Sequence, residues 1–277
     1  MPFLGDKSLK EISRADVWAI QKRFEERGTL AVVKKVRTWL YEIFGYAAAL
    51  GELDLNPARY LDELALPGRA KRTVNPFLSM AEIPALLVRL GRYRGNLQTR
   101  LAIRLLLLTG VRLADLRFAQ ILHFDFRQSL WHVEVFRGCK VLENPDRSRL
   151  IKPAYVVPLS IQTLSIVKKL SECAFPGQQY LLCHRLDPGQ TISENTLNMA
   201  LKRLGFGGRL TSQGIREMLF KSFLALGYDD DFINMQLYHI SCEEIRRTYN
   251  HALYIEQRRN MMQEWADLLD GWEKKEK

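Results

Sequence analysis

The chain has 277 residues, of which 47% are hydrophobic and 26% charged, so it can bury the core of one large domain or two ordinary ones. Its most apolar run, Leu105–Leu108, lies between Arg104 and Arg112, and its first residues lack a secretory pattern, so we expect a cytoplasmic protein with no membrane partner. The 41 Lys and Arg against 31 Asp and Glu give a formal net charge of +10, which favours a polyanionic partner such as nucleic acid.

Two helices and a short third one are expected in the first 66 residues. The first covers Glu11–Gly28 and the second Thr29–Gly51. Asn56-Pro57 is expected to open a short helix, because proline is tolerated in a first turn. In the second helix, apolar residues spaced by three and four predict one buried stripe: Val33, Val36, Leu40, Ile43, Phe44 and Ala47.

Pro67–Pro76 reads as a linker, because it has a proline at each end and a glycine between them. It carries three basic residues, Arg69, Lys71 and Arg72. Two interpretations stay open: an ordinary solvated connection, or a basic strap along a phosphate backbone. The organisation expected is therefore a helical region at 1–66, a basic linker at 67–77 and a larger domain at 78–277.

The larger domain reads as mostly helical with a small antiparallel sheet, which makes the fold class mainly α. Ser79 and Glu82 form a capping box that begins a helix through Leu90. Leu97–Gly110 is apolar nearly all round, so we expect it to be central. Strands are expected at Trp131–Phe136 and Tyr155–Leu159. Helical patterns resume at Ile161, Ser193, Ser212, Asp229 and Glu243, and from Ile255 to Trp272.

The last expected helix carries one apolar stripe, which we expect to pack on its own domain. Its members are Met261, Met262, Trp265, Leu268, Leu269 and Trp272.

No metal or other cofactor is expected. The four cysteines, Cys139, Cys173, Cys183 and Cys242, form no CxxC pair, and the five histidines form no HExxH-type set. Four free thiols in a reducing compartment are the expectation.

Three polar motifs stand in a fixed order along the larger domain. In Thr109-Gly-Val-Arg-Leu-Ala-Asp-Leu116, Arg112 lies at a helix junction, where free amides favour an anion, and Asp115 can reach back to orient it. Gln213-Gly-Ile-Arg216 follows, then His239 and Tyr249. Alone, each motif is better explained as a helix turn or a core residue.

Together, the order and spacing of these motifs resemble those of tyrosine recombinases, the phage-integrase family. The likeness runs from about Phe3 to Trp272 and is richest in Arg100–Asp115, Ser193–Asn198 and Arg246–Tyr254. It implies a helical core-binding domain followed by a tyrosine-recombinase catalytic domain.

The resemblance assigns roles to single residues. Tyr249 would be the nucleophile, Arg112 and Arg216 the two catalytic arginines, with Asp115 as acidic partner, and His239 the histidine before the nucleophile. The family's catalytic lysine lies on a β-hairpin turn, where Lys140 matches best and Lys152 remains a rival.

Gln213 departs from the family pattern, which usually has histidine at that position. Glutamine can bond a phosphate oxygen but cannot exchange a proton near neutral pH. A slower enzyme, one that uses water or Lys140 instead, and a member that binds without cutting all stay open.

The chemistry implied is strand exchange through a covalent phosphotyrosine, which keeps the energy of the phosphodiester. Two guanidinium groups suit the charge that accumulates on the phosphate oxygens, and no metal is needed. The partner would be double-stranded DNA, on which the protein forms a homo-tetramer, and a monomer is one open state for the protein free in solution. Integrases of the family often carry a further N-terminal arm-site domain, and this sequence is expected to begin beyond it.

Binding to the DNA backbone would fall to basic residues outside the catalytic set. The candidates are Lys34, Lys35, Arg37, Arg69, Lys71, Arg72, Arg203 and Arg209. Two other activities compete with recombination: an accessory DNA-binding protein that does not cut, and a topoisomerase-like enzyme that nicks and reseals one duplex.

Overall fold

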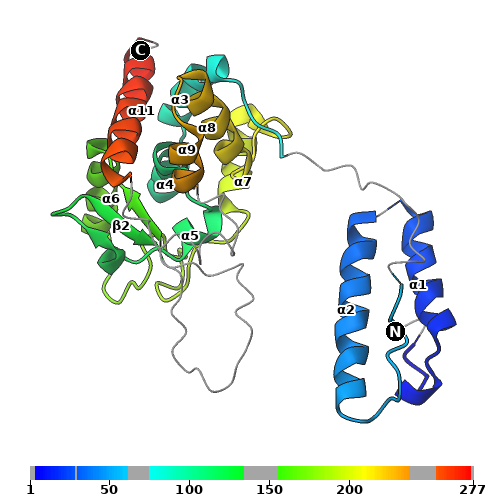
Figure 1. Ribbon diagram of the computed structural model, residues 1–277. Coiled ribbons are helices and arrows are strands. Elements are labelled where there is room, and N and C mark those ends of the chain that lie inside the picture. Colours follow the sequence, from blue (N-terminus) through cyan, green and yellow to red (C-terminus); the bar gives the residue numbers. More distant parts are fainter. Residues whose placement is uncertain (1–3, 29, 62–74, 134–154, 238–253, 276–277) are drawn as a thin grey trace. The chain divides into compact units, whose positions relative to one another are not determined.

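The structure is a computed structural model that describes residues 4–28, 30–61, 75–133, 155–237 and 254–275 (Figure 1). It divides into two compact units, Met1–Val74 and Asn75–Lys277. Each unit is described by itself.

The first unit is a pair of helices, α1 (Arg14–Glu26) and α2 (Leu30–Ala49), after a 3-10 turn at Leu9–Glu11. Ser13 caps α1, because its side chain accepts from the Asp16 amide while its own amide donates to the Asp16 carboxylate. The core of this unit is small and is formed by Val17, Phe44, Ala58 and Leu61.

The prediction that α2 has a single buried apolar stripe is only partly right. Val33, Phe44 and Ala47 are buried, but Ile43 is 58% exposed. It lies on a second apolar row with Trp39 and Tyr46, which are 58% and 70% exposed. Apolar residues therefore line two faces of α2, and spacing alone assigned Ile43 to the wrong one.

The prediction of a short helix that begins at Asn56-Pro57 is wrong. Residues 57–61 form turns instead. The Asn56 side chain accepts from the Ala58 amide at 2.8 Å, and Tyr60 has a left-handed φ of +68°. Asparagine offers its side-chain oxygen to the nearby backbone, which competes with helix formation here.

The second unit confirms the mainly α class with a small antiparallel sheet. Its strands β1 (Phe124–Asp125), β2 (Leu130–Val133) and β3 (Tyr155–Pro158) follow that order in the sheet, with Val133 opposite Tyr155. Its helices are α3 (Ile83–Gly91), α4 (Leu97–Thr109), α5 (Leu113–Arg117), α6 (Ile161–Glu172), α7 (Thr196–Leu201), α8 (Gly214–Ala225), α9 (Asp230–Leu237) and α11 (Ile255–Lys275).

Most expected elements of this unit are confirmed within three residues. The capping box of Ser79 and Glu82 is present, although a 3-10 turn at Met80–Glu82 precedes α3. Strand β1 was not expected from the sequence, because two residues are too short for an alternating pattern. The expected helix start at Glu243 and the expected strand residues 134–136 lie outside the described residues.

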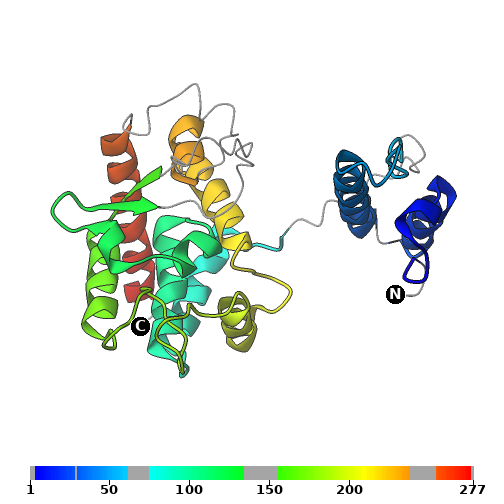
Figure 2. The same ribbon diagram turned by 90° about the horizontal axis from the view of Figure 1, so that it is seen from below.

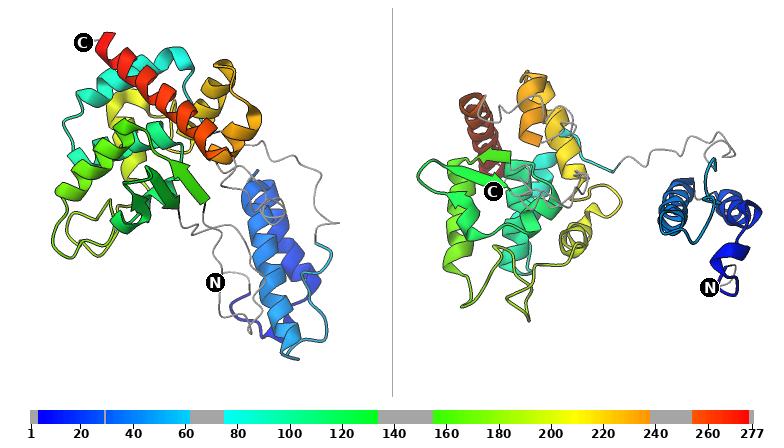
Figure 3. Two further views of the ribbon diagram at one scale, coloured as in Figure 1. Left: turned by 60° about the vertical axis from the view of Figure 1, so that its left-hand side comes forward. Right: turned by 60° about the horizontal axis from the view of Figure 1, so that its bottom comes forward.

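Helix α4 lies at the centre of the unit, as its apolar surface predicted, and α11 packs along it (Figures 2 and 3). Met261, Met262, Trp265 and Leu269 of α11 are at most 1% exposed. The stripe therefore packs on its own unit, as expected.

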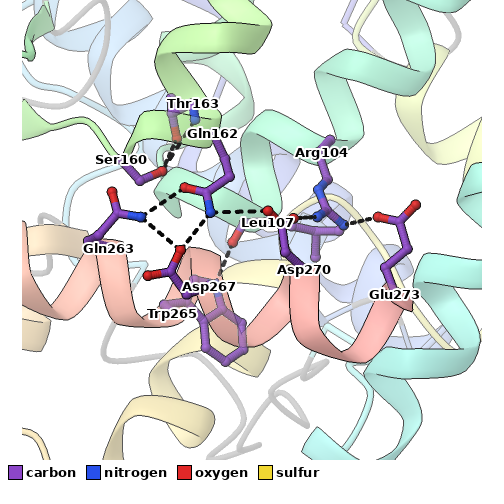
Figure 4. A network of polar contacts seen from close by, with 10 residues as sticks. All are labelled: Arg104, Leu107, Ser160, Gln162, Thr163, Gln263, Trp265, Asp267, Asp270 and Glu273. Carbon is purple, nitrogen blue, oxygen red and sulfur yellow. Dashed lines mark hydrogen bonds and ion pairs between the residues drawn. The ribbon is translucent and has the colours of Figure 1, made fainter. Parts of the chain in front are cut away.

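A polar network ties α11 to α4 and α6 (Figure 4). Arg104 of α4 donates to Asp270 at 2.6 Å, and Gln162 of α6 donates to Asp267 at 2.7 Å. The Trp265 indole donates to the Leu107 carbonyl of α4 at 2.8 Å. These contacts fix both the rotation and the position of α11 on the unit.

Candidate active site

The junction between α4 and α5 is built around Gly110. Its φ is +65°, and a Cβ at this position would lie 2.4 Å from Cδ2 of Leu237. Both the backbone conformation and the packing therefore require glycine. The Gln236 side chain donates to the Thr109 carbonyl at 2.9 Å, so the end of α9 closes the end of α4. Arg112 then stands, half-buried, as the N-cap residue of α5.

Arg216 lies on α8 beneath this junction and is only 2% exposed. Its guanidinium donates to the carbonyls of Gly110 and Leu237. Its Nε finds no hydrogen-bond partner among the described residues. Burial, and then the charge of Arg112, lower the pKa of Arg216 to about 10, so the group stays charged at neutral pH.

Asp115 brings a negative charge to the same place. It is 4% exposed, and its Oδ2 accepts a hydrogen bond from the Tyr155 hydroxyl at 3.0 Å. Burial raises the pKa of Asp115, and this effect exceeds the opposite pull of the Tyr155 hydrogen bond and of the charges on Arg112 and Arg216. The structure thus brings Arg112 and Asp115, at the start of α5, together with Arg216 of α8.

Tyr155 is a member of this cluster that the sequence reasoning missed. It lies on β3 and is 1% exposed. Burial, and then the Asp115 charge, raise its pKa well above the usual value, so the phenol remains a neutral donor. A tyrosine at an inward position of a strand needs a hydrogen-bond partner for its hydroxyl, so its place in the strand pattern indicates a polar neighbour in the core.

Gln213 is exposed at the start of α8, one turn from Arg216. The next residue, Gly214, fits because a Cβ there would lie 2.0 Å from the Pro76 carbonyl oxygen. The Thr211 amide donates to the same oxygen at 3.3 Å. The chain entering the unit at Pro76 therefore packs directly on the helix that carries Arg216.

The candidate DNA-binding residues differ in their surroundings. Lys34, Lys35 and Arg203 are exposed, and Arg37 is partly buried. Arg209 is 54% exposed at its side chain and pairs with Glu82 at 2.5 Å. The charge of Arg209 is therefore partly neutralised within the chain, unlike that of a lysine in water.

The remaining candidates lie outside the described residues: Tyr249, His239, Lys140, Lys152, Arg69, Lys71 and Arg72. The described chain stops at Leu237, whose carbonyl accepts from Arg216, and resumes at Tyr254. The ring of Tyr254 lies 5.0 Å from that of Phe232 on α9.

Two guanidinium groups and one carboxylate leave this cluster with net positive charge, which suits a phosphate better than a neutral ligand. Within the described ranges, no set of three His, Cys, Asp or Glu side chains is arranged to hold a metal ion. In that same part of the chain, no helix is both long enough and apolar enough to cross a membrane.

Comparison with known sequences gives two family matches. The description "Phage integrase family" matches residues 76–256, and "Phage integrase central domain" matches residues 1–63. The integrase of Shigella phage Sf6 is 30% identical over 272 residues, which cover 98% of this chain and 67% of that protein. The integrase of Enterobacteria phage P4 is 32% identical over 280 residues, which cover 97% of this chain and 62% of that one. This chain thus spans about two thirds of the length of these relatives.

Comparison with solved structures shows the same fold. A lambda integrase dimer bound to a COC′ core site matches with a TM-score of 0.59 and 19% identity, over 93% of this chain and 67% of that chain. The Tn1549 transposon integrase in complex with transposon right end DNA matches with a TM-score of 0.60 and 15% identity, over 92% and 86%.

Proposed function

The chain belongs to the phage integrase family, and we propose that it is a site-specific tyrosine recombinase that cuts and rejoins double-stranded DNA. The observation that carries this proposal is the proximity of the half-buried Arg112 to the buried Asp115 and Arg216. The chain leaves this cluster at Leu237, twelve residues before Tyr249.

In the proposed reaction, the Tyr249 oxygen attacks a DNA phosphorus and loses its proton. The bond from phosphorus to the 5′ oxygen breaks, which leaves a 3′-phosphotyrosine and a free 5′-hydroxyl. Attack by the 5′-hydroxyl of another strand reverses these steps and releases the tyrosine. The number of phosphoester bonds is unchanged, so no energy source is needed.

The described residues supply charge and geometry for this step. Arg112 and Arg216 would stabilise the charge that builds on the two non-bridging oxygens. Hydrogen bonds to the carbonyls of Gly110 and Leu237 already orient the guanidinium of Arg216, so little rearrangement is needed at the moment of attack. Asp115, fixed by Tyr155, would keep both cations in place.

Lys140, with Lys152 as its rival, would protonate the leaving 5′ oxygen, and His239 would bond the phosphate. Gln213 would bond a phosphate oxygen without exchanging a proton.

We further propose a homo-tetramer on two DNA duplexes in the cytoplasm, with residues 1–66 as the core-binding domain, 67–77 as the linker and 78–277 as the catalytic domain. Support comes from the family match and from the two compact units of the fold. Among the candidate DNA-binding residues that the structure describes, Lys34, Lys35 and Arg203 are exposed, which suits contacts with backbone phosphates.

A nicked suicide substrate tests the proposal, because loss of the short 5′ product traps the covalent adduct. The wild-type chain should form the adduct, and Tyr249→Phe should form none. Arg112→Lys and Arg216→Lys should slow adduct formation by about 10²–10³. DNA binding with no adduct would instead indicate an accessory protein, and relaxation of supercoils without recombinant product a topoisomerase-like enzyme.

A further inference from the structure

Helix α2 carries a row of large apolar side chains that stand exposed on the first unit. We call it the outer row; its members are Val32, Trp39, Ile43, Tyr46 and Leu50, which are between 43% and 70% exposed. Leu50 follows the last residue of α2, but its amide still donates to the Tyr46 carbonyl at 3.1 Å, so the row continues along one helical path. On the inner face of α2, by contrast, Phe44 packs with Val17 of α1. A helix with a second apolar face of this kind marks an interaction surface.

The spacing of the outer row is that of a helix which packs lengthwise on another helix. Together with the partly buried Val36, its members follow one another at intervals of 4, 3, 4, 3 and 4 residues. This is the a and d pattern of a heptad repeat, in which the side chains of one helix fit between those of a second helix. The outer row therefore fits a helix as its partner.

The order of side-chain sizes along the row fits a second copy of α2 that runs in the opposite direction. With the two copies related by a two-fold axis level with residue 41, Trp39 of each copy lies opposite Ile43 of the other. The remaining opposite pairs are Tyr46 with Val36 and Leu50 with Val32. Each aromatic side chain thus meets an aliphatic one, which fills the seam evenly. A parallel pair would instead set Trp39 against Trp39 and leave valine against valine.

The charges around the outer row also favour the antiparallel direction. Lys35 borders the row near the start of α2, while Glu52 and Asp54 follow its end, and all three residues are exposed. In the antiparallel pair, Lys35 of each copy lies toward the acidic end of the other, whereas a parallel pair would place Lys35 beside Lys35. The opposed helix dipoles act in the same sense. Glu42 of both copies lies near the axis, and this like-charge pair limits the affinity.

The area of the outer row sets the strength of such a pair. Five side chains that are about half exposed can bury on the order of 400 Å² per copy, or about 800 Å² in all. This area is below the roughly 1,200 Å² at which standard interfaces begin, so the pair should be weak, with a dissociation constant in the micromolar range.

We propose that the outer row of α2 is a self-association surface, through which two copies of the chain pair antiparallel in the absence of DNA. The partner is a second copy because the row is complementary to itself in both side-chain size and charge. This surface lies in the first unit, whereas Arg112, Asp115 and Arg216 lie in the second. Pairing through α2 thus does not depend on the proposed function, and the two can be tested separately.

Sedimentation of the full chain without DNA, from about 1 to about 200 µM, tests the proposal. The wild type should pass from monomer to dimer as its concentration rises. Ile43→Glu places a charge at the centre of the seam and should weaken pairing at least about tenfold. Tyr41→Glu is the matched control: Tyr41 is 54% exposed and lies on the opposite side of α2, so pairing should change by less than about twofold. Circular dichroism should show the same helix content in all three chains.

A pair of substitutions at the two ends of the row tests the direction of pairing. Val32→Lys and Leu50→Glu should each weaken pairing when made alone. Combined in one chain, they place opposite charges against each other at both ends of an antiparallel pair, so the double variant should pair at least about threefold more tightly than either single variant. A parallel pair would instead place like charges together at both ends.

A wild-type chain that stays monomeric over the whole range would overturn the proposal. Pairing that survives Ile43→Glu, or that Ile43→Glu and Tyr41→Glu weaken equally, would do the same, because the outer row would then not be the surface involved. A double variant that pairs less tightly than both single variants would overturn the antiparallel arrangement.

Discussion

The charge balance of the cluster depends on Asp115, a carboxyl group that burial makes easier to protonate. Because its pKa is raised in the folded state, the folded chain holds this proton more tightly than the unfolded chain. The resulting stabilisation is present below the unfolded pKa and is lost as the pH rises through the folded pKa. Asp115 therefore makes stability fall with rising pH, which is opposite to the usual effect of an ion-paired carboxylate.

Asp115→Asn should remove this dependence. Relative to the variant, the wild type should lose stability between about pH 4 and about pH 7. Urea unfolding at both pH values measures the difference in the free energy of unfolding. If the gap between wild type and variant is the same at both, the proposed titration of Asp115 is wrong.

Gln213 offers a second test at a single residue, because it stands exposed at the start of α8 where a histidine would be able to exchange a proton. Gln213→His should speed adduct formation by up to about 10². The rate of adduct formation by this variant should also depend on pH at about 6.5, a dependence that the wild type lacks. Adduct formation measured across pH gives the answer, and Gln213→Asn, which adds no titrating group, is the control. Identical pH profiles for all three chains would contradict the expectation.

At the scale of residues, the sequence indicated the two arginines and Asp115, but not Tyr155, which bonds to Asp115. The turn around Gly110 can be predicted because glycine readily adopts the left-handed backbone conformation that the turn needs. The role of Arg216 was implied by the family resemblance. The Tyr155 hydroxyl and the Arg258 guanidinium donate hydrogen bonds to partners far away in the chain, the Asp115 carboxyl and the Val156 carbonyl. A strand tyrosine or a helix arginine looks ordinary until that partner is known.

The sequence predicted a helix or strand correctly where one local pattern determined it. The prediction failed where two local preferences competed. The long apolar run of α4, with a glycine directly after it, indicated one structure only, a buried helix that ends at that glycine. Asn56-Pro57 satisfied a helix-start rule, but the Asn56 side chain made a turn with Ala58 instead. In α2, two apolar faces share one helix, and the pattern cannot say which face is covered.

Two helical glycines should respond in opposite ways to alanine. At Gly214 in α8, the new Cβ would meet the Pro76 carbonyl oxygen at 2.0 Å, so Gly214→Ala should destabilise by about 1–3 kcal/mol. At Gly271 in α11, nothing lies within 4 Å, so Gly271→Ala should stabilise by up to about 1 kcal/mol. Urea midpoints of the two variants measure this. Equal shifts would show that the backbone at Pro76 yields to the added methyl group.

The whole molecule carries a formal charge of +10, yet the basic residues are not equally available to a polyanion. Arg104 pairs with Asp270, and Arg209 with Glu82, whereas Lys34 and Lys35 lie exposed on α2. Net charge predicts that nucleic acid is attracted, but only the structure distinguishes cations already paired within the chain.

Salt dependence of DNA binding separates these two groups. Each phosphate contact steepens the slope of log affinity against log salt by about 0.9. The double variant Lys34→Gln, Lys35→Gln should therefore lower the slope by about 2 if both lysines contact phosphates. Arg209→Gln should lower it by less than about 1, because Glu82 already shares the charge of Arg209. Titrations of labelled duplex at several salt concentrations give both slopes. A larger effect from Arg209 than from the lysine pair would mean that DNA breaks the ion pair with Glu82, and that the exposed face of α2 does not lie on the backbone.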